Sequence, residues 1–483
     1  MRRLATLIAF MLAGCTVGPD YRRPSAAVPQ RYLEADVSNA GPTTAEVANW
    51  WRAFRDPQLS TLVERGVALN LDVQTAASRI REARAREIVA GASALPEVNA
   101  DASATRQRIS EHAIPIPPGG PPGSGSPGAG FALPGTEFST FRVGLDASWE
   151  IDLFGGTRRS VEAASARTHS AVWSRRDLQA STAAEIANAY LSLRTLQERI
   201  ANAERDVARQ SRLERLVGAR YRGGLTTGLD LEQQRTERAT SAAELPTLRS
   251  QAQAQIHALG VLTGTTPEAL AAELSPPKAL PLTPVIPAGL PSDLLRRRPD
   301  IRAAERELAA STADIGVAVA DLYPRFSLTA APALVSTALS SLLEWGSRSF
   351  SIGGGLLWPL FNGGKIRANI AVANARQEQA LLAYRKTVLT ALKDVEDALS
   401  NTAADRARLA DLQQALASAA RAEQLSGSRY RGGLVTYSDV LQNQGRRLTI
   451  EKQIIDTKGA LARDSVALFK ALGGGWPEGE AVQ

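Results

Sequence analysis

The chain has 483 residues, of which 44% are hydrophobic, 22% are charged and 5% are aromatic. This composition supports a folded core and argues against intrinsic disorder. A single cysteine excludes a disulfide within the chain, and three histidines are too few for a Cys/His zinc cluster. Length alone suggests roughly three average domains, but internal repetition favours one elongated unit built twice.

The N-terminus has the features of an export signal. Two arginines precede a short apolar stretch, residues 4–12, which is too short to span a bilayer. The sequence Leu-Ala-Gly-Cys that ends at Cys15 resembles the lipobox of bacterial lipoproteins, in which the cysteine is lipidated and becomes the mature N-terminus. We therefore predict a signal peptide over 1–14, lipidation of Cys15, and a lipidated extended segment over 15–55. Thr16, in place of Asp, favours the outer membrane under this resemblance. The alternative is an ordinary secretory signal with an incidental cysteine.

The mature chain is weakly basic. Loss of residues 1–14 removes two arginines and no acid, so the formal net charge falls from +7 to +5. Arginine alternates with acids along helical stretches and does not gather with aromatics in one patch, which argues against nucleic-acid binding. No later stretch reaches ~18 consecutive apolar residues, so any membrane crossing must use strands.

The sequence is internally duplicated. Residues 220–227, Arg-Tyr-Arg-Gly-Gly-Leu-Thr-Thr, match residues 429–436, Arg-Tyr-Arg-Gly-Gly-Leu-Val-Thr, at an offset of 209. The Leu-Phe-Gly-Gly of 153–156 likewise matches the Leu-Phe-Asn-Gly-Gly of 360–364. Each copy has the order helix, two strands, very long helix, glycine-rich break, helix. The predicted boundaries are a first repeat over 56–264, a Pro-rich linker over 265–290, a second repeat over 291–472 and a C-terminal tail over 473–483.

Each repeat contains a predicted β-hairpin, at about 96–153 and about 324–361. Apolar and polar residues alternate strictly over 141–153, which places one face against an apolar environment and the other in water. The other alternating segments are 97–104, 326–330 and 350–360. A Pro/Gly-rich stretch over 114–130 can form neither a ladder nor a helix, so we expect an exposed loop at the tip of the first hairpin.

These segments have the length and alternation of transmembrane β-strands, which need ~9 to 11 residues. A strand of a soluble sandwich shows the same pattern. Four strands cannot close a barrel, and lipid does not tolerate an open sheet edge. A membrane-spanning sheet therefore requires several chains to pool their strands, and a trimer with twelve strands is the simplest solution.

Two very long helices are predicted at about 157–221 and 365–430. Each has about 65 residues and hence spans roughly 95 to 100 Å at 1.5 Å per residue. Apolar residues recur within both at 3-4 spacing, which is typical of coiled-coil seams and indicates packing, not a ligand site. Glycine pairs end both helices, as at C-terminal caps.

Together these motifs resemble the TolC-like outer-membrane factors, in particular the lipoprotein branch related to OprM and NodT. The resemblance rests on the order of the lipobox, both Leu-Phe turns, both Tyr-Arg-Gly-Gly-Leu turns, the Val-Gly-Pro-Asp-Tyr-Arg-Arg-Pro of 17–24, the Trp-Trp-Arg-Ala-Phe-Arg-Asp-Pro-Gln-Leu of 50–59 and the Ala-Leu-Gly-Gly-Gly-Trp of 471–476. It covers essentially the whole mature chain. It implies an α+β membrane protein whose three chains form a twelve-stranded β-barrel in the outer membrane, continuous with a twelve-helix α-barrel of long coiled-coil helices in the periplasm.

The resemblance also implies a role for the two glycine breaks, which in the family form the periplasmic tip that closes the channel and meets an adaptor protein. The corresponding residues here are Arg220, Tyr221, Gly223, Gly224, Arg429, Tyr430, Gly432 and Gly433. Family members carry an inward acid and an arginine just after the second turn, but Gln442 and Gly445 occupy these positions here. Asp230, Asp439 and Gln442 are therefore the gate candidates. Both acids also suit a helix start, where the helix dipole favours negative charge. Three copies of one acid around a threefold axis would favour cations.

No catalytic grouping or nucleotide-binding loop is recognisable, because Gly353-Gly354-Gly355 is not followed by a phosphate-binding lysine and helix. We therefore predict a passive duct that is not an enzyme, without metal or cofactor beyond the lipid on Cys15. The expected role is the outer-membrane exit channel of a Gram-negative tripartite efflux pump for drugs or other small amphiphiles. Its expected partners are two further copies of itself, outer-membrane lipid, a periplasmic adaptor and an inner-membrane pump. The alternatives are the duct of a type I protein secretion system and a periplasmic coiled-coil lipoprotein without a channel.

Overall fold

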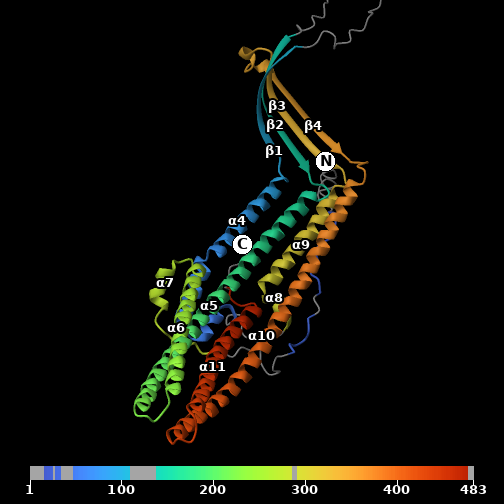
Figure 1. The fold of residues 1–483 in the computed structure, drawn as a ribbon. Coiled ribbons are helices and arrows are strands. Elements are labelled where there is room, and N and C mark those ends of the chain that lie inside the picture. The colour runs from blue at the N-terminus through green and yellow to red at the C-terminus, as the bar shows by residue number, and fades with distance from the viewer. Residues whose placement is uncertain (1–15, 26–27, 34–46, 109–136, 285–290, 477–483) are drawn as a thin grey trace, which may run out of the picture. The chain divides into compact units, whose positions relative to one another are not determined.

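The computed structural model describes residues 16–25, 28–33, 47–108, 137–284 and 291–476 (Figure 1). The predicted signal peptide, Cys15 and the Pro/Gly-rich stretch 114–130 lie outside these residues. The chain divides into two compact units. The first comprises 1–22, 84–166 and 309–378, and the second comprises 23–83, 167–308 and 379–483. Four helices have residues in both units: α4 (Leu71–Ala92), α5 (Gly156–Arg222), α9 (Pro299–Ala320) and α10 (Lys365–Arg431).

The first unit is built on a four-stranded antiparallel sheet in the order β1-β2-β3-β4. Its strands are β1 (Glu97–Arg108), β2 (Glu137–Ile151), β3 (Arg325–Ser336) and β4 (Arg348–Leu357). The register sets apolar residues opposite one another, since Val143 faces Ala102 on one side and Leu334 on the other. A shift of one residue would turn every apolar side chain to the polar face, so the alternation specifies this register. One face of the sheet is therefore apolar, as the sequence predicts.

The last strand is shorter than the alternation predicts. Strand β4 ends at Leu357, and Trp358 and Leu360 lie beyond it. Pro359 follows at once and has no N–H to donate to a ladder, which explains the early end. The indole N–H of Trp358 instead donates to the carbonyl of Leu322 at 3.1 Å.

The segment that follows Cys15 is fastened within the first unit to the junction between β2 and α5. The N–H of Val17 donates to the carbonyl of Phe154 at 3.1 Å. The Arg159 side chain, only 4% exposed, binds the Asp20 carboxylate at 2.6 Å and donates to the Val17 carbonyl at 3.2 Å. This buried cation holds the segment in place by a charge-assisted hydrogen bond.

The second unit contains the parts of the four shared helices outside the first unit and all of η1 (Trp50–Phe54), α3 (Pro57–Leu69), α6 (Gly228–Leu262), α7 (Pro267–Leu274), α8 (Pro291–Arg297) and α11 (Tyr437–Ala471). In its main core Trp50 and Leu62 meet α5, where Ile186 and Leu193 of the predicted 3-4 seam are fully buried. Val395 of α10 is buried in a second core. Among the described residues, no helix combines the length and apolarity needed to cross a membrane.

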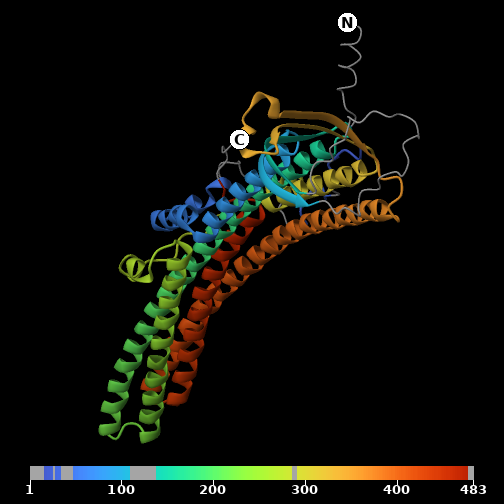
Figure 2. The same ribbon diagram turned by 90° about the horizontal axis from the view of Figure 1, so that it is seen from above.

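The long helices of the two sequence repeats match each other closely in length. Helices α5 and α10 have 67 residues each, and α6 and α11 have 35 each. Figures 1 and 2 show the α5–α6 and α10–α11 hairpins side by side, with both turns at the same end. The two predicted glycine breaks are thus neighbours in space.

Candidate functional site

The two hairpin turns have the same backbone. Gly224 and Gly433 adopt positive φ angles of 69° and 76°, which L side chains rarely adopt. After the first helix the N–H of Leu225 donates to the Arg220 carbonyl at 2.8 Å, and after the second the N–H of Leu434 donates to the Arg429 carbonyl at 2.9 Å. Such a bond, spanning six residues around a left-handed glycine, is a Schellman cap. It satisfies carbonyls at the end of each long helix and lets the chain turn sharply into the following helix.

Both gate-candidate acids lie in the first turn of the helix that follows. The Asp439 carboxylate accepts hydrogen bonds from the N–H and the hydroxyl of Thr436, at 2.9 and 2.7 Å. These bonds hold the pKa of this exposed carboxyl below its usual range. In the first repeat the N–H of Asp230 donates to the Thr227 hydroxyl at 3.3 Å. Asp439 therefore caps helix α11 together with Thr436, whereas Thr227 is the cap of α6 and Asp230 supplies only its N–H. Gln442 is exposed one turn further along α11.

A polar contact joins the two hairpins at the tip. The Thr226 hydroxyl donates to the Asp230 carboxylate and lies 3.1 Å from the Tyr430 hydroxyl. Because a threonine hydroxyl carries one proton, the Tyr430 hydroxyl is the donor in the second bond. The Arg220 guanidinium lies 5.0 Å from the centre of the Tyr430 ring, in cation–π contact. Thr226 thus links Asp230 to Tyr430, and Tyr430 in turn contacts Arg220. Sequence reasoning missed Thr226.

A second contact between the hairpins lies just behind the first. The Tyr437 hydroxyl donates to the side-chain oxygen of Gln234, and the Gln234 amide donates to the Gln210 carbonyl at 3.0 Å. Burial raises the pKa of Tyr437, and Tyr430 and Asp230 nearby add to the effect. Sequence reasoning missed Tyr437 and Gln234. The sequence does carry a signal for Tyr437, because the equivalent position of the first repeat holds Gly228 and the two repeats differ there.

Other predicted tip residues face solvent. Tyr221 is 48% exposed, and Arg429, the repeat equivalent of Arg220, is also exposed. Leu225 and Leu434 at the two turns are 69% and 77% exposed. The tip therefore presents apolar and basic groups to solvent.

Further from the turns, an ion cluster joins three helices. The Glu244 carboxylate of α6 pairs with Lys452 of α11 and, at 2.9 Å, with Arg199 of α5. Arg199 also binds Asp456 of α11 at 2.6 Å. Burial opposes ionisation of Glu244, but hydrogen bonds from Lys452 and Arg199 outweigh it and hold its pKa below the usual range. This cluster ties the two hairpins together at a second level.

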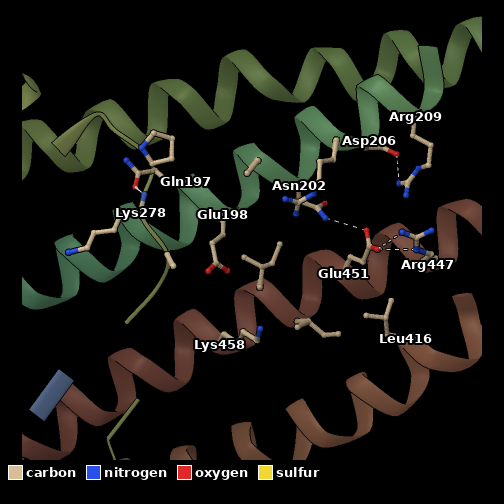
Figure 3. Close-up of a pocket in the computed structure, with 16 residues that line it drawn as sticks. Gln197, Glu198, Asn202, Asp206, Arg209, Lys278, Leu416, Arg447, Glu451 and Lys458 are labelled. Atoms are coloured by element: carbon tan, nitrogen blue, oxygen red, sulfur yellow. Dashed lines mark hydrogen bonds and ion pairs between the residues drawn. The ribbon is translucent and has the colours of Figure 1, made fainter. Parts of the chain in front are cut away.

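A cavity of about 590 Å³ lies at the same level of α5 and α11 (Figure 3). Across it the Asn202 amide donates to Glu451 at 3.2 Å, and Arg447 binds both Glu451 and Glu423. The lining is mostly charged and polar, with Leu416 at its α10 side. Within the ranges that the structure describes, no group of three or more His, Cys, Asp or Glu is placed to hold a metal ion.

Comparison with known proteins gives the family. The model of the family described as outer membrane efflux protein matches residues 62–265 and 290–474. The pyoverdine export outer membrane protein OpmQ of Pseudomonas aeruginosa is 34% identical over 99% of this chain and 97% of its own length. The toluene efflux pump outer membrane protein TtgF of Pseudomonas putida is 30% identical over 98% of this chain and 96% of its own. The solved structure of the outer-membrane channel OprN superposes with a TM-score of 0.86 at 34% identity, covering 96% of this chain and 100% of the other. The chain therefore belongs to the family of outer membrane efflux proteins.

Proposed function

We propose that three copies of this chain close into the exit duct of a tripartite efflux pump in the outer membrane of a Gram-negative bacterium. The open sheet supports this closure. Its order is β1-β2-β3-β4, so β1 and β4 each leave one edge without a partner strand in the described residues. Lipid does not tolerate unpaired edges, and pairing β1 of one copy with β4 of the next removes them all. A trimer then has a twelve-stranded barrel continued by twelve long helices.

The duct works passively beside a periplasmic adaptor and an inner-membrane pump, which supplies the energy. Two relatives support a duct that selects little, because one is named for export of pyoverdine and the other for efflux of toluene. These cargoes share little chemistry, so recognition belongs to the pump. Small amphiphilic solutes are the cargo expected here.

The hairpin turns form the periplasmic gate, and the contacts between hairpins hold it closed. Opening must separate Tyr430 from Thr226 and Tyr437 from Gln234, because these bonds join the α5–α6 hairpin to the α10–α11 hairpin. The exposed Asp439 carboxylate, repeated three times, gives the entrance a cation preference. Gln442, one turn further along α11, is uncharged and adds nothing to this preference. An adaptor that docks on the exposed tip residues shifts the equilibrium if it binds the open form more tightly.

The lipid on Cys15 anchors the chain at the base of the barrel. Support comes from the segment directly after it, where Val17 and Asp20 are held at the β2–α5 junction by Phe154 and Arg159. That junction is where the strands give way to helix. A lipid attached one residue before Thr16 is therefore held near the membrane boundary.

The observation that carries this proposal is the bonded contact between the turns of the two hairpins. It is tested by single-channel recording of the purified full-length protein in a planar bilayer, with Tyr430→Phe compared with Tyr221→Phe. The two tyrosines are repeat equivalents, but the Tyr430 hydroxyl joins the hairpins and the Tyr221 ring is half exposed. Loss of one hydrogen bond should raise the open probability about twofold to tenfold for Tyr430→Phe only. Equal behaviour of the two variants would overturn this assignment of the gate.

A further inference from the structure

The apolar face of the sheet carries arginine side chains near its hairpin turns. Directly opposed residues share a face, so ladder pairs define rows across the sheet. Arg348 pairs with Leu334, Leu334 with Val143, and Val143 with Ala102. Arg348 therefore stands on the apolar face, in one row with three apolar residues.

Two more arginines lie on this face, closer to the first turn. Arg106 and Arg108 follow Ala102 at alternate positions of β1, so they share its face. Their side chains are 76% and 72% exposed, and both approach the Glu137 carboxylate, at 3.0 and 3.8 Å. Arg106 and Arg108 thus share one carboxylate, which leaves one positive charge in excess on β1. Arg348 lies on β4, at the opposite edge of the sheet.

Arg348 is free to bind an anion. Its Nε donates to the carbonyl of Trp345 at 2.8 Å, and its guanidinium stacks over the Trp345 ring. No carboxylate pairs with it within the part of the chain that the structure describes. Trp345 and Leu343 beside it are 79% and 84% exposed. Exposed aromatic and apolar groups next to a cation are typical of the interface between hydrocarbon and headgroups.

Next to Arg348 the apolar face is hollowed. A depression of about 620 Å³ crosses the sheet, with Arg348 at its border. Small residues, including Ala100 and Ala102, make it shallow, and Leu145 and Phe350 bound it with larger apolar surface. The depression therefore offers an apolar surface for a hydrocarbon chain, with the Arg348 guanidinium at its border.

We propose that the depression and the three arginines bind a phosphorylated lipid of the outer leaflet. An acyl chain lies in the depression and the phosphate pairs with Arg348. Arg106 and Arg108 of the neighbouring copy, whose β1 pairs with β4 in the proposed trimer, add charge. Arginine pairs with phosphate in a two-bonded geometry and stays charged at every physiological pH. The inference rests on the proposed function, because it requires the sheet to span the outer membrane with its hairpin turns outward. In the trimer the arginines of β1 and β4 border each joint between neighbouring copies.

The test measures lipid retention by the purified full-length trimer with native mass spectrometry. The probes are lipid A, which carries two phosphates, and its dephosphorylated form. The variants are Arg348→Gln and the triple change that adds R106Q and R108Q. The control is Arg325→Gln, at the other end of the sheet and ion-paired with Asp321. Wild type and control should prefer phosphorylated lipid at least about tenfold, and the triple variant should lose this preference.

Three outcomes would overturn the inference. One is equal retention of both lipid forms by the wild type, and another is an unchanged preference in the triple variant. The third is full competition by millimolar inorganic phosphate, which would show a simple anion site with no contribution from the acyl chain. Conductance of the same preparations separates this inference from the proposed function. Normal channel steps without phosphate-dependent retention contradict the lipid site alone, whereas a variant that lacks the turns 223–227 and 432–436 and still never conducts contradicts the duct.

Discussion

Glu244→Gln should weaken the closed gate without touching the tip. The carboxylate joins α6 to Lys452 of α11 and to Arg199 of α5, so it spans the two hairpins. The change keeps the shape of the side chain and removes its charge. The Lys452 and Arg199 cations then lose their shared partner, and separating the hairpins costs less.

The size of the effect follows from burial. The side chains of Arg199, Glu244 and Lys452 are 18%, 27% and 26% exposed. Their burial is therefore intermediate. Exposed ion pairs are worth about 0–1 kcal/mol, and breaking a buried pair costs about 3–5 kcal/mol. We expect about 1–2 kcal/mol per chain, which changes the opening equilibrium about five- to thirtyfold.

The same cluster predicts a pH dependence. The pKa of Glu244 in the closed state is lowered from its ordinary value of 4.5. The cluster therefore contributes fully above that value, and its contribution is lost as the pH falls through the lowered pKa. Wild-type protein should open more easily in acid, and Glu244→Gln should show a smaller change.

Single-channel open probability checks both expectations, with Glu204→Gln as the control. Glu204 pairs with Arg249 at 2.9 Å, but this pair joins α5 to α6 within one hairpin. The control should keep the wild-type open probability. An unchanged open probability in Glu244→Gln, or an equal rise in the control, would refute the reasoning.

Three further changes have defined outcomes. Asp439→Asn should reduce the cation preference in reversal-potential measurements, and the wild-type preference should persist to a lower pH than an ordinary aspartate would allow, because hydrogen bonds from Thr436 lower the pKa of this carboxyl. Gly474→Ala should lower the unfolding free energy by about 1–3 kcal/mol in thermal melts, since a Cβ there would lie 2.5 Å from the Val47 carbonyl oxygen; Gly346→Ala, with open space around it, should be neutral. Arg159→Leu should expose the segment after Cys15 to limited proteolysis, and unchanged cleavage would contradict its role as the fastening residue.

The architecture was predictable where the sequence carries a period. Alternation over 141–153 identified one face of β2, and the 3-4 seam with Ile186 and Leu193 identified the buried side of α5. These patterns show which side of a strand or helix is buried, and that side decides how the element packs. The end of β4 was predicted too late because the apolar alternation continues past Pro359, where the ladder cannot.

Contacts between the hairpins could not be predicted from the sequence. The duplication shows that residues 220–227 and 429–436 are equivalent, but it does not give the rotation of one hairpin against the other. That rotation decides that Tyr430 meets Thr226 while its equivalent Tyr221 faces solvent. The helix-capping role of Asp439 needs local sequence only, and it was foreseen as an alternative.

The central claim is that the hairpin turns close a water-filled duct, and single-channel conductance of the purified, lipidated protein tests it most directly. The comparison is between the wild type and a variant that lacks the turns 223–227 and 432–436. We predict rare, brief cation-selective steps from the wild type and sustained large steps from the variant. Silence that persists after both turns are removed would contradict the duct and favour a periplasmic lipoprotein without a channel.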